Sequence, residues 1–513
     1  MRLPAKRAAA ALLSILLLAG CMQEDFQTDE DFLPDLPGIS EPAQEELIAL
    51  PGQISLSYYA RQPLDPITCP DGPQQTIGAL LYEGLFQLDE TFSPQPLLCE
   101  RFSYNPENLT YVFTLRSDVA FSDGSPLTAS DVAVSLNRAR ASQRYGARFS
   151  EVDSVTASDG AVTIRLIAPN TAFPALLDIP IVKKNSEDPD RPLGTGPYAC
   201  AFDEGSACLV ANPFWSRHGT QPVERINLLP AQDEDSLLYQ FTSHETQFLC
   251  ADPTGSTSVS VTGSVDFQDA DTSVMQYIGI NVNHPLLSSA SLREALGEGF
   301  DRQQIVSALL SGHGTAAQFP ISPVSPEYPK DLEHVYSYDR FEQAMSRPAF
   351  VDREEPAHLT MLVNEENSFK VTAARAIAAS LSAFDLRVDV RLLPWEEFTA
   401  ALEAGDFELY YGEVKLTADW DLRPLLSTGG ALNYGGYSSA TTDQLLADCG
   451  AYAQDRAAAR AALCRWIQKS APILPICFKS SSVLVQTGVA KLTPTASNPF
   501  YGISELEFHL AGQ

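Results

Sequence analysis

The chain has 513 residues, of which 44% are hydrophobic, and its 34 Lys and Arg against 65 Asp and Glu give a formal net charge of −31 at pH 7. This excess of negative charge argues against a nucleic-acid partner, because binding to a phosphate backbone needs a basic surface. The length is enough for two or three domains, each with a hydrophobic core of its own.

The first residues have the pattern of a bacterial export signal. Three basic residues precede an apolar run over residues 8–19, which is shorter than the roughly twenty residues that a membrane-spanning helix needs. The run leads to Leu-Ala-Gly-Cys ending at Cys21, which resembles the lipobox of bacterial lipoproteins, where the cysteine carries lipid and begins the mature chain. We therefore expect removal of residues 1–20 and a lipid on Cys21 that anchors the protein to the extracytoplasmic face of the cell membrane, with ordinary secretion as the alternative.

Residues 21–51 are acidic, rich in proline and poor in apolar periodicity. Such a segment buries too little apolar surface to fold, because burial would not offset the loss of conformational entropy. Its acidic residues also lack the spacing of an EF-hand calcium loop. We expect this segment to be a disordered tether.

Residues 100–200 predict a small α+β subdomain. Strand patterns at 110–116 and 161–167 lie on either side of one helical stretch. Thr128 is a suitable cap for that helix, and Asp131 falls in its first turn, where the helix dipole favours a negative charge.

The chain has nine cysteines, and eight remain if Cys21 carries lipid, an even number in a compartment that permits disulfides. Cys200 and Cys208 lie on either side of a short segment in which Gly205 suits a tight turn. We expect these two cysteines to face each other across a hairpin and to form a disulfide, with two small buried thiols as the alternative. The sequence leaves the pairing of the remaining six open: Cys69, Cys99, Cys250, Cys449, Cys464 and Cys477. No CxxC motif or Cys/His cluster predicts a structural zinc site.

The clearest fold signal lies in residues 357–414, where strand and helix patterns alternate as βαβαβ. This alternation predicts a largely parallel sheet in an α/β fold, with Ser368 as the cap of the first helix and Gly405 at the end of the second. A further helical pair is predicted over residues 292–312, closed by Gly312.

The usual catalytic signatures are missing from the sequence. There is no GxSxG, HExxH or GxxxxGK[ST] motif, and no GxGxxG motif after a strand. Asp419 and Asp421 form a possible carboxylate pair for glycoside hydrolysis, but nothing in the sequence gives their separation. A second pair, Glu396 and Glu397, is better explained by the dipole of the helix it opens. We therefore expect a binding protein and not an enzyme, with an extracellular hydrolase as the less favoured alternative.

A series of segments, taken together, is similar to one family: the dipeptide- and oligopeptide-binding extracytoplasmic solute-binding proteins, which deliver ligands to ABC importers. The segments are LDP at 64–66, LYEGLFQLDE at 81–90, LTYVFTLRSDVAFSDGSPLTASDVAVSLNRA at 109–139, GTGPY at 194–198, YIGINVN at 277–283, LREALGEGFDRQQIVSALLSGHGTA at 292–316 and NYGGYSSATTDQLL at 433–446. The stretch at 109–139 and GTGPY are the most specific. Gly194 and Gly196 of GTGPY suit a constrained turn without ligand contact.

The resemblance implies a two-lobed periplasmic-binding-protein fold, with an extra α+β subdomain inserted in the first lobe. The first lobe would take residues 52–75, 191–273 and 480–513, the insert 76–190, and the second lobe 274–479. The protein would be a monomer that closes on a small solute between its lobes and then meets the permease of an ABC transporter. The resemblance implies no metal or other cofactor.

The ligand is not fixed by the fold, because the family includes binders of dipeptides, oligopeptides, nickel chelates, haem and oligosaccharides. Peptide binders of the family carry an aspartate in an Ala-Asp-aromatic setting, where it pairs with the α-amino group of the ligand. Ala418, Asp419 and Trp420 match that setting. Phe398 stands where oligopeptide binders often place a cleft tryptophan. We expect a di- or oligopeptide held by Asp419, Trp420 and Phe398, with an oligosaccharide, a nickel chelate or haem as alternatives. For the Trp420 ring, core packing is an equal alternative to lining the cleft. We expect Asp421 to be a solvated loop charge or a turn-former.

Overall fold

The computed structural model describes residues 53–203, 205–216, 221–256, 261, 264–346, 356–451 and 455–507. All of them belong to one compact unit. The predicted signal peptide, Cys21 and the predicted tether lie outside the described residues. None of the helices described is long and apolar enough to cross a membrane.

A four-stranded sheet, here called the first sheet, has the strand order β1-β10-β9-β8, with β1 parallel to β10 and the other pairs antiparallel. Its elements and their neighbours are β1 (Gln53–Tyr59), α1 (Pro73–Leu81), β8 (Tyr198–Asp203), β9 (Ser206–Ala211), β10 (Arg225–Ala231) and α3 (Glu234–Thr242). Helix α1 packs on this sheet through Ile77, Leu80 and Leu81, which share one hydrophobic core with Ile54 and Leu56 of β1.

Between α1 and β8 the chain builds a second, antiparallel sheet, here called the inserted sheet, in the order β4-β5-β7-β6. The elements of this region are β2 (Phe86–Leu88), β3 (Pro94–Pro96), β4 (Cys99–Asn105), β5 (Thr110–Leu115), α2 (Ala129–Arg140), β6 (Val152–Ser158) and β7 (Ala161–Leu166). The predicted cap of α2 is confirmed, because the Thr128 hydroxyl and the Asp131 carboxylate each accept a hydrogen bond from the other's backbone N–H. The α+β character expected for this stretch is therefore present.

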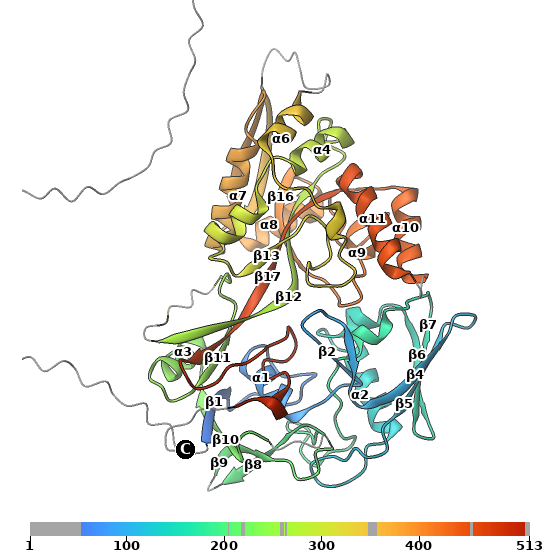
Figure 1. Cartoon of the computed structure of the whole chain (residues 1–513), viewed down its shortest axis with the longest axis vertical. Helices are drawn as coiled ribbons and strands as arrows, with labels where there is room; N and C mark the ends of the chain where they lie inside the picture. The colour runs from blue at the N-terminus through green and yellow to red at the C-terminus, as the bar shows by residue number, and fades with distance from the viewer. Residues whose placement is uncertain are drawn as a thin grey trace, which may run out of the picture. The chain divides into compact units, whose positions relative to one another are not determined.

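The remaining elements build a seven-stranded sheet, here called the large sheet, in the order β11-β17-β12-β16-β14-β15, with β13 also paired to β17. Its strands are β11 (Phe248–Ala251), β12 (Val265–Ile280), β13 (Gly314–Ala316), β14 (Ala357–Asn364), β15 (Leu386–Leu393), β16 (Leu409–Lys415) and β17 (Ile473–Gln486). Its helices are α4 (Ala290–Gly297), α5 (Arg302–Gln304), α6 (Tyr338–Met345), α7 (Ser368–Leu381), α8 (Trp395–Ala404), α9 (Arg423–Leu426), α10 (Ala440–Ala451) and α11 (Arg456–Ser470). Figure 1 shows β12 and β17 side by side through the middle of this region.

The predicted βαβαβ unit is confirmed as β14, α7, β15, α8 and β16, and all three strands are parallel. Alternate residues of β14 face opposite sides of the sheet, which is why both sides can be covered by helices. Met361 and Val363 join the core that α7 covers, whereas Leu362 joins the core that contains residues of α8 and α11. The α/β class expected from the sequence follows directly from this alternation.

The observed ends of α7 and α8 test the helix caps that the sequence predicted. The Asn367 side chain, and not Ser368, caps α7 by accepting a hydrogen bond from the Lys370 N–H, so the predicted cap was wrong by one residue. Asn and Ser are both good caps, and the sequence places them next to each other. Gly405 ends α8 with φ +70°, as predicted.

The two glycines of GTGPY allow a close approach between backbones. A Cβ at Gly194 would lie 2.0 Å from the Leu81 carbonyl oxygen, and one at Gly196 would lie 2.6 Å from the carbonyl oxygen of Leu80. The Gly196 N–H also donates to the Leu81 carbonyl at 3.0 Å. These glycines therefore let the chain that enters β8 pack directly against the backbone at the end of α1.

The expected disulfide between Cys200 and Cys208 is not present, and both residues are free thiols. Strands β8 and β9 do form the predicted hairpin, with Gly205 at φ +86° in its turn. However, Cys200 stands opposite Leu209 and Cys208 stands opposite Ala201. A register offset of one residue places the two side chains on opposite faces of the hairpin, from which they cannot be bridged.

Substitution of Gly196 by alanine is expected to destabilise the fold. The added methyl group would collide with the backbone at the end of α1, and overpacking of this kind costs about 1–3 kcal/mol. Gly78→Ala in α1 is the matched control, because its Cβ would meet only Tyr82 at 3.8 Å and alanine favours a helix by up to about 1 kcal/mol. Urea unfolding of both variants measures the difference, and equal stability of the two would contradict this account of GTGPY.

The register of the β8–β9 hairpin predicts the redox state of its cysteines. Exported protein that is denatured without a reductant should react with iodoacetamide at both Cys200 and Cys208, because neither is in a disulfide. Peptide mass spectrometry of digests prepared with and without prior reduction measures this directly. A peptide pair linked through these two residues, which separates on reduction, would show that the hairpin has another register in solution.

Candidate functional site

The carboxyl ends of β14, β15 and β16 meet at one edge of the large sheet because the three strands are parallel and adjacent. In open α/β sheets, ligands bind beyond this edge. Three short segments follow the strands there: residues 365–367, 394–395 and 416–420. All the ligand-binding residues predicted from the sequence lie in the last of these segments or in helix α8.

Asp419 lies where the inserted sheet meets the large sheet. Its carboxylate is buried and accepts a hydrogen bond from the Asn170 amide at 2.8 Å, and a second from the Thr417 hydroxyl at 2.6 Å. Asn170 follows β7 of the inserted sheet, and the next residue, Thr171, donates its N–H to the carbonyl of Gly450 at the end of α10. Asp419 is therefore held between two parts of the chain that are far apart in sequence.

The Asp419 carboxylate has only neutral donors. Among the described residues no Lys, Arg or His forms an ion pair with it: Arg460 donates to the Asp419 backbone carbonyl at 2.5 Å, and Arg456 and Arg460 interact with the carboxylate only electrostatically. Asp421 differs, since Arg423 binds it through its backbone N–H and its guanidinium. Asp421 is therefore ion-paired and not solvated, and the hydrogen bond from the Arg423 backbone makes it a turn-former, which is the second role expected from the sequence. Burial and the neighbouring Asp419 carboxylate raise the pKa of Asp421 to about 6.

Trp420 belongs to the hydrophobic core and does not line a cleft. Its side chain is 1% exposed, and its ring makes edge-to-face contacts with Phe92 and Phe478. The indole N–H donates to the Ser325 hydroxyl at 3.1 Å, which satisfies the polar group of the buried ring. Of the two roles expected for Trp420, core packing is the one that the structure shows.

Phe398 is buried in the same core, with its ring against Tyr410, so it does not reach the ligand edge. The exposed aromatic residue of α8 is Trp395, which is 55% exposed and stacks on Phe398 at 5.9 Å between ring centroids. The backbone N–H of Trp395 donates to the Glu366 carboxylate at 2.7 Å, and this hydrogen bond connects the segments that follow β14 and β15. The sequence could have predicted this position of Trp395, because it is the first helical residue after a strand and therefore lies at the carboxyl edge of the sheet.

A cavity of about 590 Å³ lies away from these residues. It is bordered by the first half of β12, by residues 488–495 and by Glu90, and its walls carry the carboxylates of Asp266, Asp269 and Asp271. None of the predicted site residues borders it. Within the described part of the chain no group of three or more His, Cys, Asp or Glu side chains is arranged to hold a metal ion.

Solved structures with the same fold include two that differ in what their names say they bind. One is MppA, a periplasmic murein tripeptide binding protein in its unliganded open form, with 18% sequence identity and a TM-score of 0.72 over 89% of this chain and 97% of that chain. The other is a nickel ABC transporter protein from Bacillus halodurans, with 19% identity and a TM-score of 0.72 over 86% of this chain and 96% of that chain. At these identities the likeness shows the fold, which is the two-lobed α/β fold of periplasmic binding proteins expected from the sequence.

A relative by sequence is the glutathione-binding protein GsiB of Salmonella typhi, which is 26% identical over 276 residues, or 51% of this chain. The alignment spans about half of the relative, 54% of its length. Residues 93–431 match the family model of the bacterial extracellular solute-binding proteins, family 5, middle region. Because this match covers more than half of the chain, the protein belongs to the bacterial extracellular solute-binding proteins of family 5.

Proposed function

We propose that the protein captures a di- or oligopeptide between two lobes and delivers it to the permease of an ABC importer. Proteins of the family bind small solutes and work with such permeases. The names of GsiB and MppA, which refer to glutathione and to a murein tripeptide, support a peptide ligand. The nickel protein among the structural neighbours supports a nickel chelate as the second candidate.

One observation carries the peptide proposal: the buried Asp419 carboxylate accepts hydrogen bonds only from neutral groups among the described residues, while Arg456 and Arg460 interact with it electrostatically without forming an ion pair. A buried charge is costly unless it is paired, and two neutral donors offset only part of that cost. A carboxylate can accept about four hydrogen bonds, so the ammonium group of a peptide could bind in addition to Asn170 and Thr417.

The lobe boundaries predicted from the sequence are part of this proposal. The second lobe, residues 274–479, would present Asp419 and the exposed ring of Trp395 at the carboxyl edge of its parallel strands. Aromatic rings provide a large apolar surface that tolerates different side chains of a ligand. We therefore assign Trp395, in place of Phe398, to the side-chain region of the peptide site.

Asp419→Asn should nearly abolish peptide binding while changing the stability of the ligand-free protein little. Loss of one partner of a desolvated charge pair costs roughly 2–5 kcal/mol, which is about thirtyfold to several thousandfold in affinity. Titration calorimetry with a short peptide identified by thermal-shift screening measures the effect. Asp448→Asn is the control, because Asp448 lies on the exposed face of α10 and contacts Gln444.

The same titration with N-acetylated peptide tests the ligand group. Acetylation removes the ammonium charge, so wild-type protein should bind the acetylated peptide as weakly as Asp419→Asn binds the free peptide. Equal affinity of wild type and Asp419→Asn would exclude Asp419 as the anchor. If nickel with histidine, or an oligosaccharide, stabilised the protein and no peptide did, the peptide proposal would be wrong. The proposed transport role would be unaffected.

We also propose that a lipid on Cys21 keeps the protein at the membrane. A lipid chain contributes about 0.8 kcal/mol of membrane affinity for each buried methylene, so the modified protein should partition into detergent with the membrane fraction. Cys21→Ser should release it into the soluble extracytoplasmic fraction. Fractionation of cells expressing either form measures this, and wild-type protein found only in the soluble fraction would contradict the anchor.

A further inference from the structure

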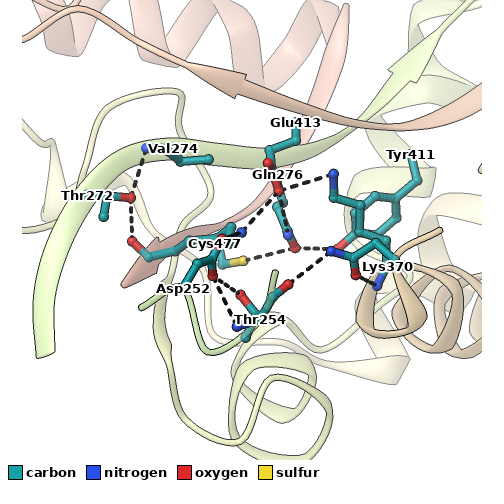
Figure 2. Close-up of polar contacts among 11 residues, drawn as sticks. Asp252, Thr254, Thr272, Val274, Gln276, Lys370, Tyr411, Glu413 and Cys477 are labelled. Atoms are coloured by element: carbon teal, nitrogen blue, oxygen red, sulfur yellow. Dashed lines mark hydrogen bonds and ion pairs between the residues drawn. The ribbon is translucent and has the colours of Figure 1, made fainter. Parts of the chain in front are cut away.

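The pairing of β12 with β17 is interrupted between Asp271 and Met275 of β12, where the register shifts. Asp271 pairs with Ser480 and Met275 pairs with Phe478, so Lys479 is the one β17 residue between these two partners. Here the Thr272 hydroxyl replaces ladder contacts: it donates to the Lys479 carbonyl at 2.6 Å and accepts from the Val274 N–H at 3.1 Å. Figure 2 shows these contacts beside a network of polar side chains. The lobe boundaries predicted from the sequence fall at this interruption.

The Lys479 side chain, 5% exposed, connects the two sides of the interruption. It forms an ion pair with Asp252, which follows β11, and lies 3.6 Å from the carboxylate of Glu413 on β16. Strand β11 pairs only with residues 482–485 of β17, on the side assigned to the first lobe. Lys479 thus has one carboxylate from each proposed lobe.

Glu413 is fixed on the side of the second lobe. The Lys370 ammonium lies 3.3 Å from its carboxylate, and the Gln276 amide donates to the same oxygen at 3.1 Å. Burial opposes ionisation of Glu413, but Lys370 and Lys479 hold its pKa below the ordinary value. The three charges of Lys370, Glu413 and Lys479 therefore form a unit that does not depend on the first lobe.

A second contact crosses between the proposed lobes beside the first. The Asn367 amide donates to the Thr254 carbonyl at 3.0 Å, while its oxygen caps α7 by accepting the Lys370 N–H at 2.9 Å. Thr254 and Asn367 are both buried. The turn that contains Thr254 is itself closed by the Asp252 carboxylate, which accepts hydrogen bonds from the Thr254 N–H and hydroxyl.

We propose that the turn of residues 252–255 is a releasable latch that holds the two lobes closed through Asp252–Lys479 and Thr254–Asn367. The inference rests on the proposed function, because it needs lobes that open and close. The Asp252 side chain is 47% exposed, so water can take over its charge when the turn moves away. Lys479 remains paired with Glu413, so release leaves no buried charge without a partner.

Two substitutions weaken the latch while keeping the local structure. Asp252→Asn removes the charge that faces Lys479 but retains the oxygen that closes the turn. Asn367→Asp removes the donor to Thr254 but retains the oxygen that caps α7. Asp123→Asn is the matched control, since its partner Lys183 lies with it inside the proposed insert and the Asp123 side chain, like that of Asp252, is partly exposed.

Small-angle X-ray scattering of the ligand-free chain carrying Cys21→Ser, which removes the expected lipid, measures the separation of the lobes. Both latch variants should have a larger radius of gyration than the parent, and the control should not. Added salt should expand the parent but leave Asp252→Asn unchanged, because the exposed ion pair is already gone. Affinity for a peptide should fall by roughly two- to fivefold in the latch variants.

Unchanged scattering in both latch variants would overturn the proposal, and so would a loss of thermal stability without expansion, which would mark the contacts as ordinary packing. The scattering needs no ligand, so the latch and the proposed function can fail separately. If the latch variants had a larger radius of gyration but no peptide bound to the protein, the latch would be supported and the peptide ligand would be rejected. If a peptide reduced the radius of gyration equally in the parent and in all variants, the peptide ligand would be supported and the latch would be rejected.

Discussion

The antiparallel pairing of β12 with β17 is the constraint on which the rest of the structure depends. β16 attaches to β12 and carries β14 and β15 beyond it, while β11 and β13 attach to β17. Every strand of the large sheet is therefore positioned by these two. The interruption of their ladder at Lys479 is tolerated because the Thr272 hydroxyl satisfies the backbone groups that the register shift leaves free.

Buried charge is distributed unevenly around this pairing. Beside Lys479 the charges balance, since two lysines meet the carboxylates of Glu413 and Asp252. At Asp419 the carboxylate has no direct ion pair among the described residues, since its hydrogen-bond donors are neutral and Arg456 and Arg460 interact with it only electrostatically. A network of direct ion pairs can be purely structural, whereas a buried carboxylate without a direct ion pair leaves a position that the cation of a ligand can occupy. This difference is the physical reason for assigning the first cluster to conformation and the second to ligand binding.

The sequence predicted those features that depend on local pattern. The βαβαβ unit, the cap at Thr128 and the end of α8 at Gly405 are each encoded within a few residues. Features that depend on register or on distant contacts were missed. Cys200 and Cys208 have suitable spacing, but a one-residue offset in the hairpin separates their side chains. Trp420 and Phe398 are apolar residues near a predicted site, and only tertiary packing against Phe92 and Tyr410 shows that both are buried. No pattern indicated that Asn170 would contact Asp419 across 249 residues.

The contact between Asn170 and Asp419 also explains how binding could drive closure. A ligand shifts a conformational equilibrium only by its difference in affinity for the two states. A cation placed beside Asp419 would be desolvated only while the segment that carries Asn170 covers the carboxylate from the other side. Its interaction with Asp419 would be screened by water once that segment moved away, because the same charge pair is much weaker in a high dielectric. An ammonium group at this position therefore contributes more to the closed form than to the open form. A neutral sugar hydroxyl, which gains less from the exclusion of water, would provide a smaller difference.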